Sequence, residues 1–197
     1  MRTAIKTAVR WLCLVAVWPS AALSRFGRIG PAFTFFAHAY AIIPGLVGDY
    51  LRRAYYSLTL ESCSPEIQVG FGTYFSHSGA RIARGAGFGA YCIIGRVNIG
   101  ERSLAGSRVH ILSGQHQHAR DADGRLVAGD MTEVNIGADC WIGEAAIIMS
   151  DVGPRSTIAA GAVVSTPVPA GSMAAGNPAR VVMARRSEPA SAATHAN

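Results

Sequence analysis

The chain has 197 residues, enough for one domain with an appendage, and half of them are apolar. The formal net charge of +6 lies within residues 1–53, which hold seven basic residues and Asp49 as the single acidic residue. No zinc-finger spacing or aromatic-basic RNA motif accompanies this charge, which argues against a nucleic-acid partner. The four cysteines form no CxxC pair, a usage typical of free thiols in a reducing compartment.

Residues 1–48 contain two apolar stretches that predict short helices at a membrane surface. The first, Trp11–Leu23, follows Lys6 and Arg10 and is too short to cross a bilayer, which needs about 20 apolar residues. The second, residues 29–48, is interrupted by two prolines. Basic residues beside apolar stretches are typical of helices that lie in the interface of anionic lipid. Two alternatives remain open: a cleaved signal peptide, and a helical cap packed on the rest of the chain or on a partner subunit.

A third helix is expected to begin at Asp49, as its N-cap residue, and to run through Leu60. Arg52 and Arg53 would lie on its more exposed side. The pattern becomes strand-like near Cys63, and the small polar tail predicts disorder. The expected divisions are a helical, membrane-associating segment (1–60), a β domain (61–183) and a disordered tail (184–197).

A six-residue period dominates the β domain. It falls on Ile82, Phe88, Ile94, Ile99, Ala105, Ile111, Ile136, Ile142, Ile148, Ile158 and Val164. A shift of one at Ile93/Ile94 and one coil shortened around Asp151–Pro154 interrupt it. Because Ala105 is small for a corner, either a shallow void or the neighbouring Leu104 must fill the space. This period fits neither a helix nor an alternating strand. It indicates a hexapeptide β-helix, where three units close a triangular coil around inward-pointing corner residues.

One long segment, residues 113–133, interrupts the repeat with the polar sequence SGQHQHARDADGRLVAGDMTE. A loop of this length inside a compact repeat is usually functional or disordered. It contains His116 and His118, and His110 stands just before it on a strand, where it would point outward. We therefore expect this loop to carry functional side chains.

Four C-terminal phrases resemble a known family: WIG (141–143), AGAVV (160–164), PVPAGS (167–172) and AGNPARV (175–181). They are similar to the last coils of the left-handed β-helix acyltransferases, which include galactoside, maltose, serine and xenobiotic O-acetyltransferases. The segments IIPGLVGDYLRRAYYSLTL and FGTYFSHSGARI resemble bacterial acetyltransferases of capsule or exopolysaccharide synthesis. The resemblance covers about residues 40–183.

This resemblance implies a mainly β protein, a left-handed parallel β-helix or hexapeptide-repeat prism, with an α-helical N-terminal appendage. It implies a homotrimer that binds acetyl-CoA between neighbouring prisms and acetylates a saccharide hydroxyl, with a lipid-linked saccharide among the acceptors to be considered and no metal expected. Because acetyl-CoA is a cytosolic metabolite, the expected location is the cytoplasmic face of the inner membrane, with residues 1–48 on the lipid surface.

The resemblance also implies roles for individual residues. The general base would be His116 or His118, because a neutral histidine can take the proton of a hydroxyl near pH 7. The residues implied in coenzyme binding are Glu144, Ala160, Ser165, Thr166 and Arg180. Ala160 would offer a backbone group to the pantetheine arm, and Arg180 would meet the nucleotide end.

Three other functions remain open. A zinc enzyme like the γ-type carbonic anhydrases shares this solenoid, although its histidine spacing differs from that of His110, His116 and His118. A small-molecule enzyme like serine O-acetyltransferase is suggested by the segment around His77, but the large helical domain of that family is absent. A non-catalytic trimeric scaffold is the third.

Overall fold

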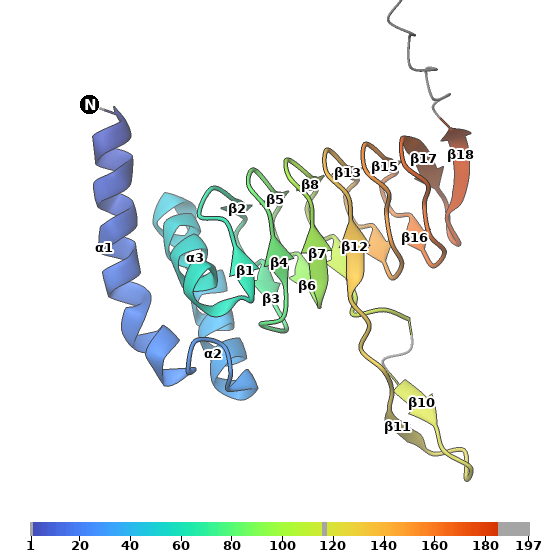
Figure 1. The fold of residues 1–197 in the computed structure, drawn as a ribbon, viewed down its shortest axis with the longest axis horizontal. Coiled ribbons are helices and arrows are strands. Elements are labelled where there is room, and N and C mark those ends of the chain that lie inside the picture. Colours follow the sequence, from blue (N-terminus) through green and yellow to red (C-terminus); the bar gives the residue numbers. More distant parts are fainter. Residues whose placement is uncertain (1, 116–117, 185–197) are drawn as a thin grey trace, which may run out of the picture.

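A computed structural model describes residues 2–115 and 118–184, with residues 2–6 described by their backbone alone. Three helices at one end are followed by a parallel β-solenoid, and a hairpin projects from its side (Figure 1). The helices are α1 (Arg2–Leu23), α2 (Gly30–Ala41) and α3 (Gly45–Thr59). The tail predicted to be disordered, residues 184–197, lies outside the described residues except for Ala184.

The solenoid has three flat faces, which we number in the order the chain visits them. Face 1 contains β1 (Ser62–Cys63), β4 (Arg81–Ile82), β7 (Val97–Ile99) and β12 (Val134–Ile136). Face 2 contains β2 (Gln68–Val69), β5 (Gly87–Phe88), β8 (Leu104–Ala105), β13 (Trp141–Ile142), β15 (Thr157–Ile158) and β17 (Ser172–Ala175), with β18 (Arg180–Ala184) antiparallel at its end. Face 3 contains β3 (Tyr74–Phe75), β6 (Ile93–Ile94), β9 (His110–Ile111), β14 (Ile147–Ile148) and β16 (Val163–Val164).

The predicted corner residues form the core of the solenoid. On face 3, Ile94 pairs with Ile111, which pairs with Ile148, and all three side chains are fully buried. Inward residues therefore stack directly above one another from coil to coil, and the predicted β-helix fold is confirmed. The tight stacking also explains the glycines after the corners, because a Cβ on Gly137 would lie 2.4 Å from the backbone nitrogen of Pro154.

The predicted break at residues 151–154 contains a corner that the six-residue count misses. Val152 is buried and bridges Ile136 on one side and Val168 on the other, in line with face 1. It follows Ile148 by four residues instead of six, because the chain turns tightly from face 3 to face 1 at this point. The coil is thus complete, with one short turn.

Ala105 stacks between Phe88 and Ile142 in the interior of face 2. Leu104 points outward and is exposed, so it does not fill the space left by the small corner residue. A small cavity lies there, lined in part by Phe88, Ile99 and Ile142. The structure therefore has the shallow void, and not the filling by Leu104, beside Ala105.

The third helix, α3, differs from the sequence-based expectation. This helix begins at Gly45 after Pro44, so Asp49 lies inside it and is not its N-cap residue. The Asp49 carboxylate instead accepts a hydrogen bond from the backbone N–H of Val69 (3.1 Å) and forms an ion pair with Arg53 (3.1 Å). Arg52, expected on the exposed side, is 1% exposed. Both corrections have one cause: α3 packs its charged residues against the first coil.

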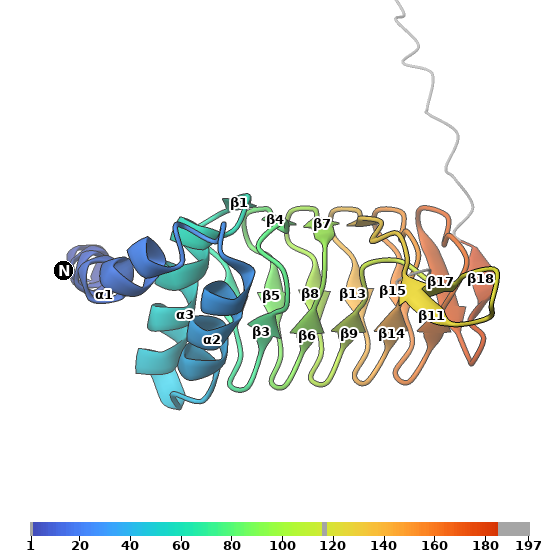
Figure 2. The same ribbon diagram turned by 90° about the horizontal axis from the view of Figure 1, so that it is seen from below.

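The three helices cover the first coil of the solenoid and extend beyond it. Figure 2 shows α2 and α3 against the first coil, with α1 on the far side of α3. Tyr55 and Tyr56 of α3 are fully buried, and Tyr56 packs edge to face on Phe75 of the first coil with ring centroids 4.7 Å apart. None of the described helices is both long enough and apolar enough to cross a membrane.

Candidate active site

The histidine-bearing loop leaves the solenoid at the edge where face 3 turns into face 1, which we call the loop edge. Residues 118–128 form an antiparallel hairpin of β10 (His118–Arg120) and β11 (Leu126–Ala128), in which His118 pairs with Ala128. Figure 1 shows this hairpin projecting away from the prism. The loop thus has strand structure of its own, which its polar sequence did not predict.

Both ends of the loop are fixed to the prism. At its start the buried Ser113 hydroxyl accepts a hydrogen bond from the backbone N–H of Arg96 (2.9 Å), and the Gln115 side-chain amide donates to the carbonyl oxygen of Ser165. At its end Glu133 forms an ion pair with Arg81 on face 1. The segment that carries the candidate base is therefore anchored on both sides.

The candidate bases differ in whether the structure describes them and in where they lie. His116 lies outside the described residues; the residue before it, Gln115, is the one tied to Ser165. His118, at the start of β10, is exposed to solvent. His110 points outward from β9, between Ile93 and Ile147 of the neighbouring coils, and is half-buried as expected of a strand position.

A further histidine, His77, lies on the same loop edge, two coils before the loop. Partial burial and the nearby positive charge of Arg96 lower the pKa of His77. Lowering the pKa of a histidine favours its neutral form, the form that accepts a proton. The loop edge therefore brings His77 and the start of the loop onto one line of the prism.

The five residues implied in coenzyme binding fall into two groups. Glu144 and Ala160 lie on adjacent turns at the edge between faces 2 and 3, where the N–H of Gly161 donates to the Glu144 carbonyl (2.8 Å). Arg180 begins β18 beside this same edge, paired with Ala175. Ser165 and Thr166 lie instead on the loop edge, in the turn that follows β16. The two groups border face 3 from opposite sides.

Face 3 lies between these groups and presents an apolar outer surface. The outward residues of its strands are half-buried: Tyr74, Ile93, His110, Ile147 and Val163. Figure 2 shows β3, β6, β9 and β14 in line along this face. The outward residues of face 1, such as Asn98, Asn135 and Asp151, are polar by contrast. The six-residue period predicted which residues point inward, but it did not distinguish the apolar outer surface of face 3 from the polar outer surface of face 1.

Two residues of the site were missed by sequence reasoning. Ser113 and Gln115 anchor the loop, and neither belongs to a repeat position or to a motif that would single it out. Within the described residues, no three His, Cys, Asp or Glu side chains are grouped closely enough to hold a metal ion.

Comparison with known proteins adds a likeness of fold. No protein-family profile matches the sequence, and no curated protein is significantly similar to it. A maltose O-acetyltransferase from Clostridium difficile 630 superposes with a TM-score of 0.71 at 21% identity, covering 85% of this chain and 91% of that one. A hexapeptide-repeat-containing acetyltransferase from Vibrio cholerae superposes with a TM-score of 0.62 at 20% identity, covering 78% of this chain and 91% of that one. The chain therefore has the left-handed β-helix fold of the hexapeptide-repeat acetyltransferases.

Proposed function

We propose that the protein is an acetyl-CoA-dependent O-acetyltransferase that acts on a saccharide hydroxyl. The observation that carries this proposal is the histidine-bearing loop, anchored through Gln115 to Ser165 on the edge of the prism. The fold supports it, since the two similar structures are named as acetyltransferases and one of them as a maltose O-acetyltransferase. Fold alone does not determine chemistry, so the loop is the stronger support.

The chemistry requires a base and donors for an oxyanion. A neutral loop histidine, His116 or His118, takes the proton from the sugar hydroxyl as its oxygen attacks the carbonyl carbon of the thioester. The tetrahedral oxyanion is stabilised by hydrogen-bond donors and then collapses. The carbon–sulfur bond breaks, and the CoA sulfur leaves with the proton that the histidine held. No covalent enzyme intermediate is needed.

The assembly we propose is a homotrimer with coenzyme bound where two prisms meet. The apolar outer residues of face 3, such as Ile93, Ile147 and Val163, favour contact with another prism over contact with water. Residues implied in coenzyme binding border this face on both sides. Light scattering tests the assembly: a monomer at micromolar concentration would contradict it.

The acceptor we propose is a glycan intermediate of exopolysaccharide, capsule or glycolipid synthesis, acetylated where acetyl-CoA is available, on the cytoplasmic side of the membrane. Support comes from the resemblance of residues 42–60 and 71–82 to acetyltransferases of those pathways. Calorimetry with CoA, followed by mass spectrometry of saccharides incubated with enzyme and acetyl-CoA, tests the activity. Acetylated sugar supports the proposal; absence of CoA binding would instead favour a non-catalytic scaffold.

A further inference from the structure

Helix α1 is apolar on both of its sides. One side, with Val17 and Ala21 fully buried, packs toward α3. The other side faces solvent, yet it consists of large apolar side chains that are between 57% and 71% exposed: Trp11, Leu12, Val15, Trp18 and Leu23. The outer side of a surface helix in a globular protein is normally polar. A contiguous exposed apolar surface of this kind marks a place where something else binds.

The surface continues at both borders of the helix. A groove of about 570 Å³ runs between α1 and α3, and its lining residues are all apolar: Trp11, Leu14, Val15, Trp18, Pro19 and Leu58. At the C-terminal end of α1, Phe26 packs edge to face on Trp18, with ring centroids 6.5 Å apart, and is itself exposed. We call the outer side of α1, this groove and the turn of residues 25–29 the cap surface.

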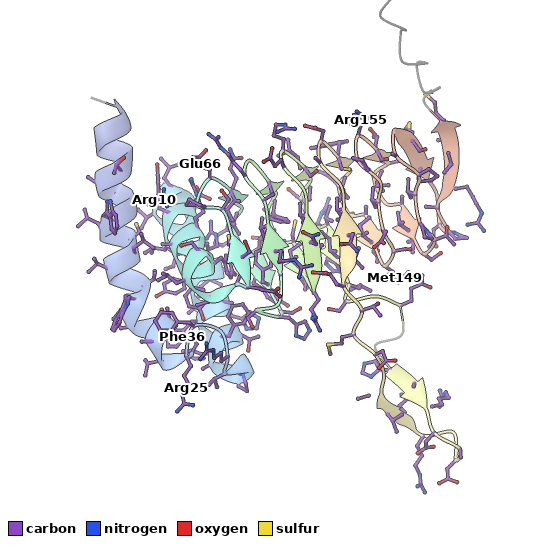
Figure 3. The ribbon with its side chains drawn as sticks, in the orientation of Figure 1. Arg10, Arg25, Phe36, Glu66, Met149 and Arg155 are labelled. Carbon is purple, nitrogen blue, oxygen red and sulfur yellow. The ribbon has the colours of Figure 1, made fainter. Side chains whose placement is uncertain are left out.

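Positive charge lies beside this apolar surface. Arg25 and Arg28 are exposed in the turn after α1 and alternate there with the exposed Phe26 and Ile29. Neither arginine has an ion pair among the residues that the structure describes. Figure 3 shows Arg25 pointing away from the body of the protein at the end of the cap.

Not all of the basic residues in residues 1–53 are available to a partner. Arg52 is buried, and Arg53 is paired with Asp49. The seven basic residues expected to attract lipid are therefore reduced to five, of which Arg10, Arg25 and Arg28 have described and exposed side chains. The loss of Arg52 and Arg53 weakens the expected attraction to an anionic partner. The cations that remain exposed all belong to α1 and the turn that follows it.

The position of α1 makes the cap surface the end of the molecule. Figure 1 shows α1 lying across the solenoid axis, and Figures 1 and 2 agree that it is the element farthest from β18. A flat partner perpendicular to the solenoid axis could therefore contact α1 along its length without touching the prism.

We propose that the cap surface docks into the headgroup region of an anionic lipid bilayer, with the solenoid standing upright on the membrane. Tryptophan is favoured at such interfaces, because its ring is largely apolar while its N–H can bind water or headgroups. Arginines beside the apolar side chains complement anionic lipid. A second copy of this chain would instead bring an equally cationic surface against them, so lipid is the favoured occupant.

This orientation places the candidate active site near the membrane. The loop leaves the solenoid from the third coil, about 10 Å beyond the first coil, and the two helix layers of the cap add about 20 Å between the first coil and the lipid surface. Saccharides carried on membrane lipids would then lie within reach of the loop edge. The docking surface itself does not depend on the proposed catalysis and can be tested without it.

The test uses the three tryptophans of the full-length chain and vesicles with brominated acyl chains, which quench tryptophan fluorescence only on close contact. The variant Trp141→Phe keeps Trp11 and Trp18 as the only tryptophans, whereas the double variant Trp11→Phe/Trp18→Phe keeps Trp141, which is exposed on the prism. We expect strong quenching in Trp141→Phe with vesicles containing phosphatidylglycerol and little in the double variant. Absence of quenching in Trp141→Phe overturns the proposal.

Vesicle sedimentation separates the apolar and charged contributions. Trp11→Ser/Trp18→Ser should lower binding at least tenfold, and its matched control Trp141→Ser should not. Arg25→Gln/Arg28→Gln should weaken binding to anionic vesicles severalfold, whereas Arg155→Gln, on the far part of the prism in Figure 3, should leave it unchanged. Equal loss of binding in the control variants would contradict docking on lipid. A protein that does not bind vesicles, but whose mass in light scattering doubles in a way that depends on Trp11 and Trp18, would also contradict it. That second result would assign the surface to another copy of the chain.

Discussion

The guanidinium group of Arg52 donates a hydrogen bond from Nε to the backbone carbonyl oxygen of Val69, 2.9 Å away, and so joins α3 to the first coil of the solenoid. The same side chain donates from one terminal nitrogen to the carbonyl oxygens of Tyr40 (3.1 Å), in the last turn of α2, and Ile43 (2.8 Å), just after that helix. Burial lowers the pKa of Arg52, and the negative charge of Asp49 acts in the opposite sense. One buried cation thus holds two helices and the solenoid together.

Removing this cation should destabilise the cap. Arg52→Met removes the Arg52 hydrogen bonds to the carbonyl oxygens of Val69 and Ile43, at a cost of about 1–3 kcal/mol for each carbonyl left unsatisfied, so we expect the free energy of unfolding to fall by about 2 kcal/mol or more. Urea denaturation measures it. The neighbouring Arg53→Met breaks a partly exposed ion pair and should cost about 1 kcal/mol or less. Equal losses in the two variants would contradict the role given to Arg52.

The corner residues should tolerate no charge. Ile142→Asp places an unpaired carboxylate in the interior of the solenoid, at a cost of several kcal/mol, and should prevent stable folding. Trp141→Asp changes the adjacent residue, which points outward from the same strand, and should retain the far-ultraviolet circular dichroism spectrum of the parent. A folded Ile142→Asp protein with an unchanged melting temperature would show that the inward assignment is wrong.

Alkaline pH should unfold the protein through its buried tyrosines. Burial raises the pKa of Tyr55 to about 12, and it raises that of Tyr56 as well. Because the folded pKa lies above the unfolded value of about 10, this stability is fully present below about pH 10 and is lost as the pH rises toward 12. Urea midpoints should therefore be constant up to about pH 10 and fall between about pH 10 and pH 12. A smaller fall in Tyr55→Phe supports the assignment; an identical fall argues against it.

The anchor of the loop should matter for turnover more than for coenzyme affinity. Gln115→Ala removes the hydrogen bond to Ser165, and looser positioning of the following segment should lower kcat about tenfold while the KM for acetyl-CoA changes little. Asp123→Ala, in the exposed turn of the hairpin, is the matched control and should keep full activity. A rise in KM at constant kcat would mean that Gln115 supports binding of coenzyme rather than position of the loop.

The solenoid could be predicted from the sequence because its period is local. Each inward residue, such as Ile142 or Ile158, is followed within one or two residues by a small residue at the turn, and the count repeats without reference to distant segments. Val152 escaped the count because a turn between faces can be shortened by two residues. The burial of Arg52 could not be predicted, since it depends on Val69 and on the end of α2, which only the folded chain brings together.

The candidate site could be predicted only in part. A long polar insertion with histidines identified the loop, and the C-terminal phrases identified turns that border face 3. The sequence did not reveal that Glu144 and Ser165 lie on opposite edges of that face, because position around the prism depends on the cumulative length of every turn. The anchoring of Gln115 is likewise a contact across 50 residues, without a local pattern to indicate it.

The most direct test of the account is the rate of acetyl transfer from acetyl-CoA to a saccharide in the parent protein, in His116→Ala and in His118→Ala. Loss of the general base should slow transfer by about 10²–10⁴-fold in one of the two variants, while the affinity for CoA measured by calorimetry stays nearly unchanged. Full activity in both variants, or no saccharide-dependent release of CoA by the parent protein, would contradict the proposed function.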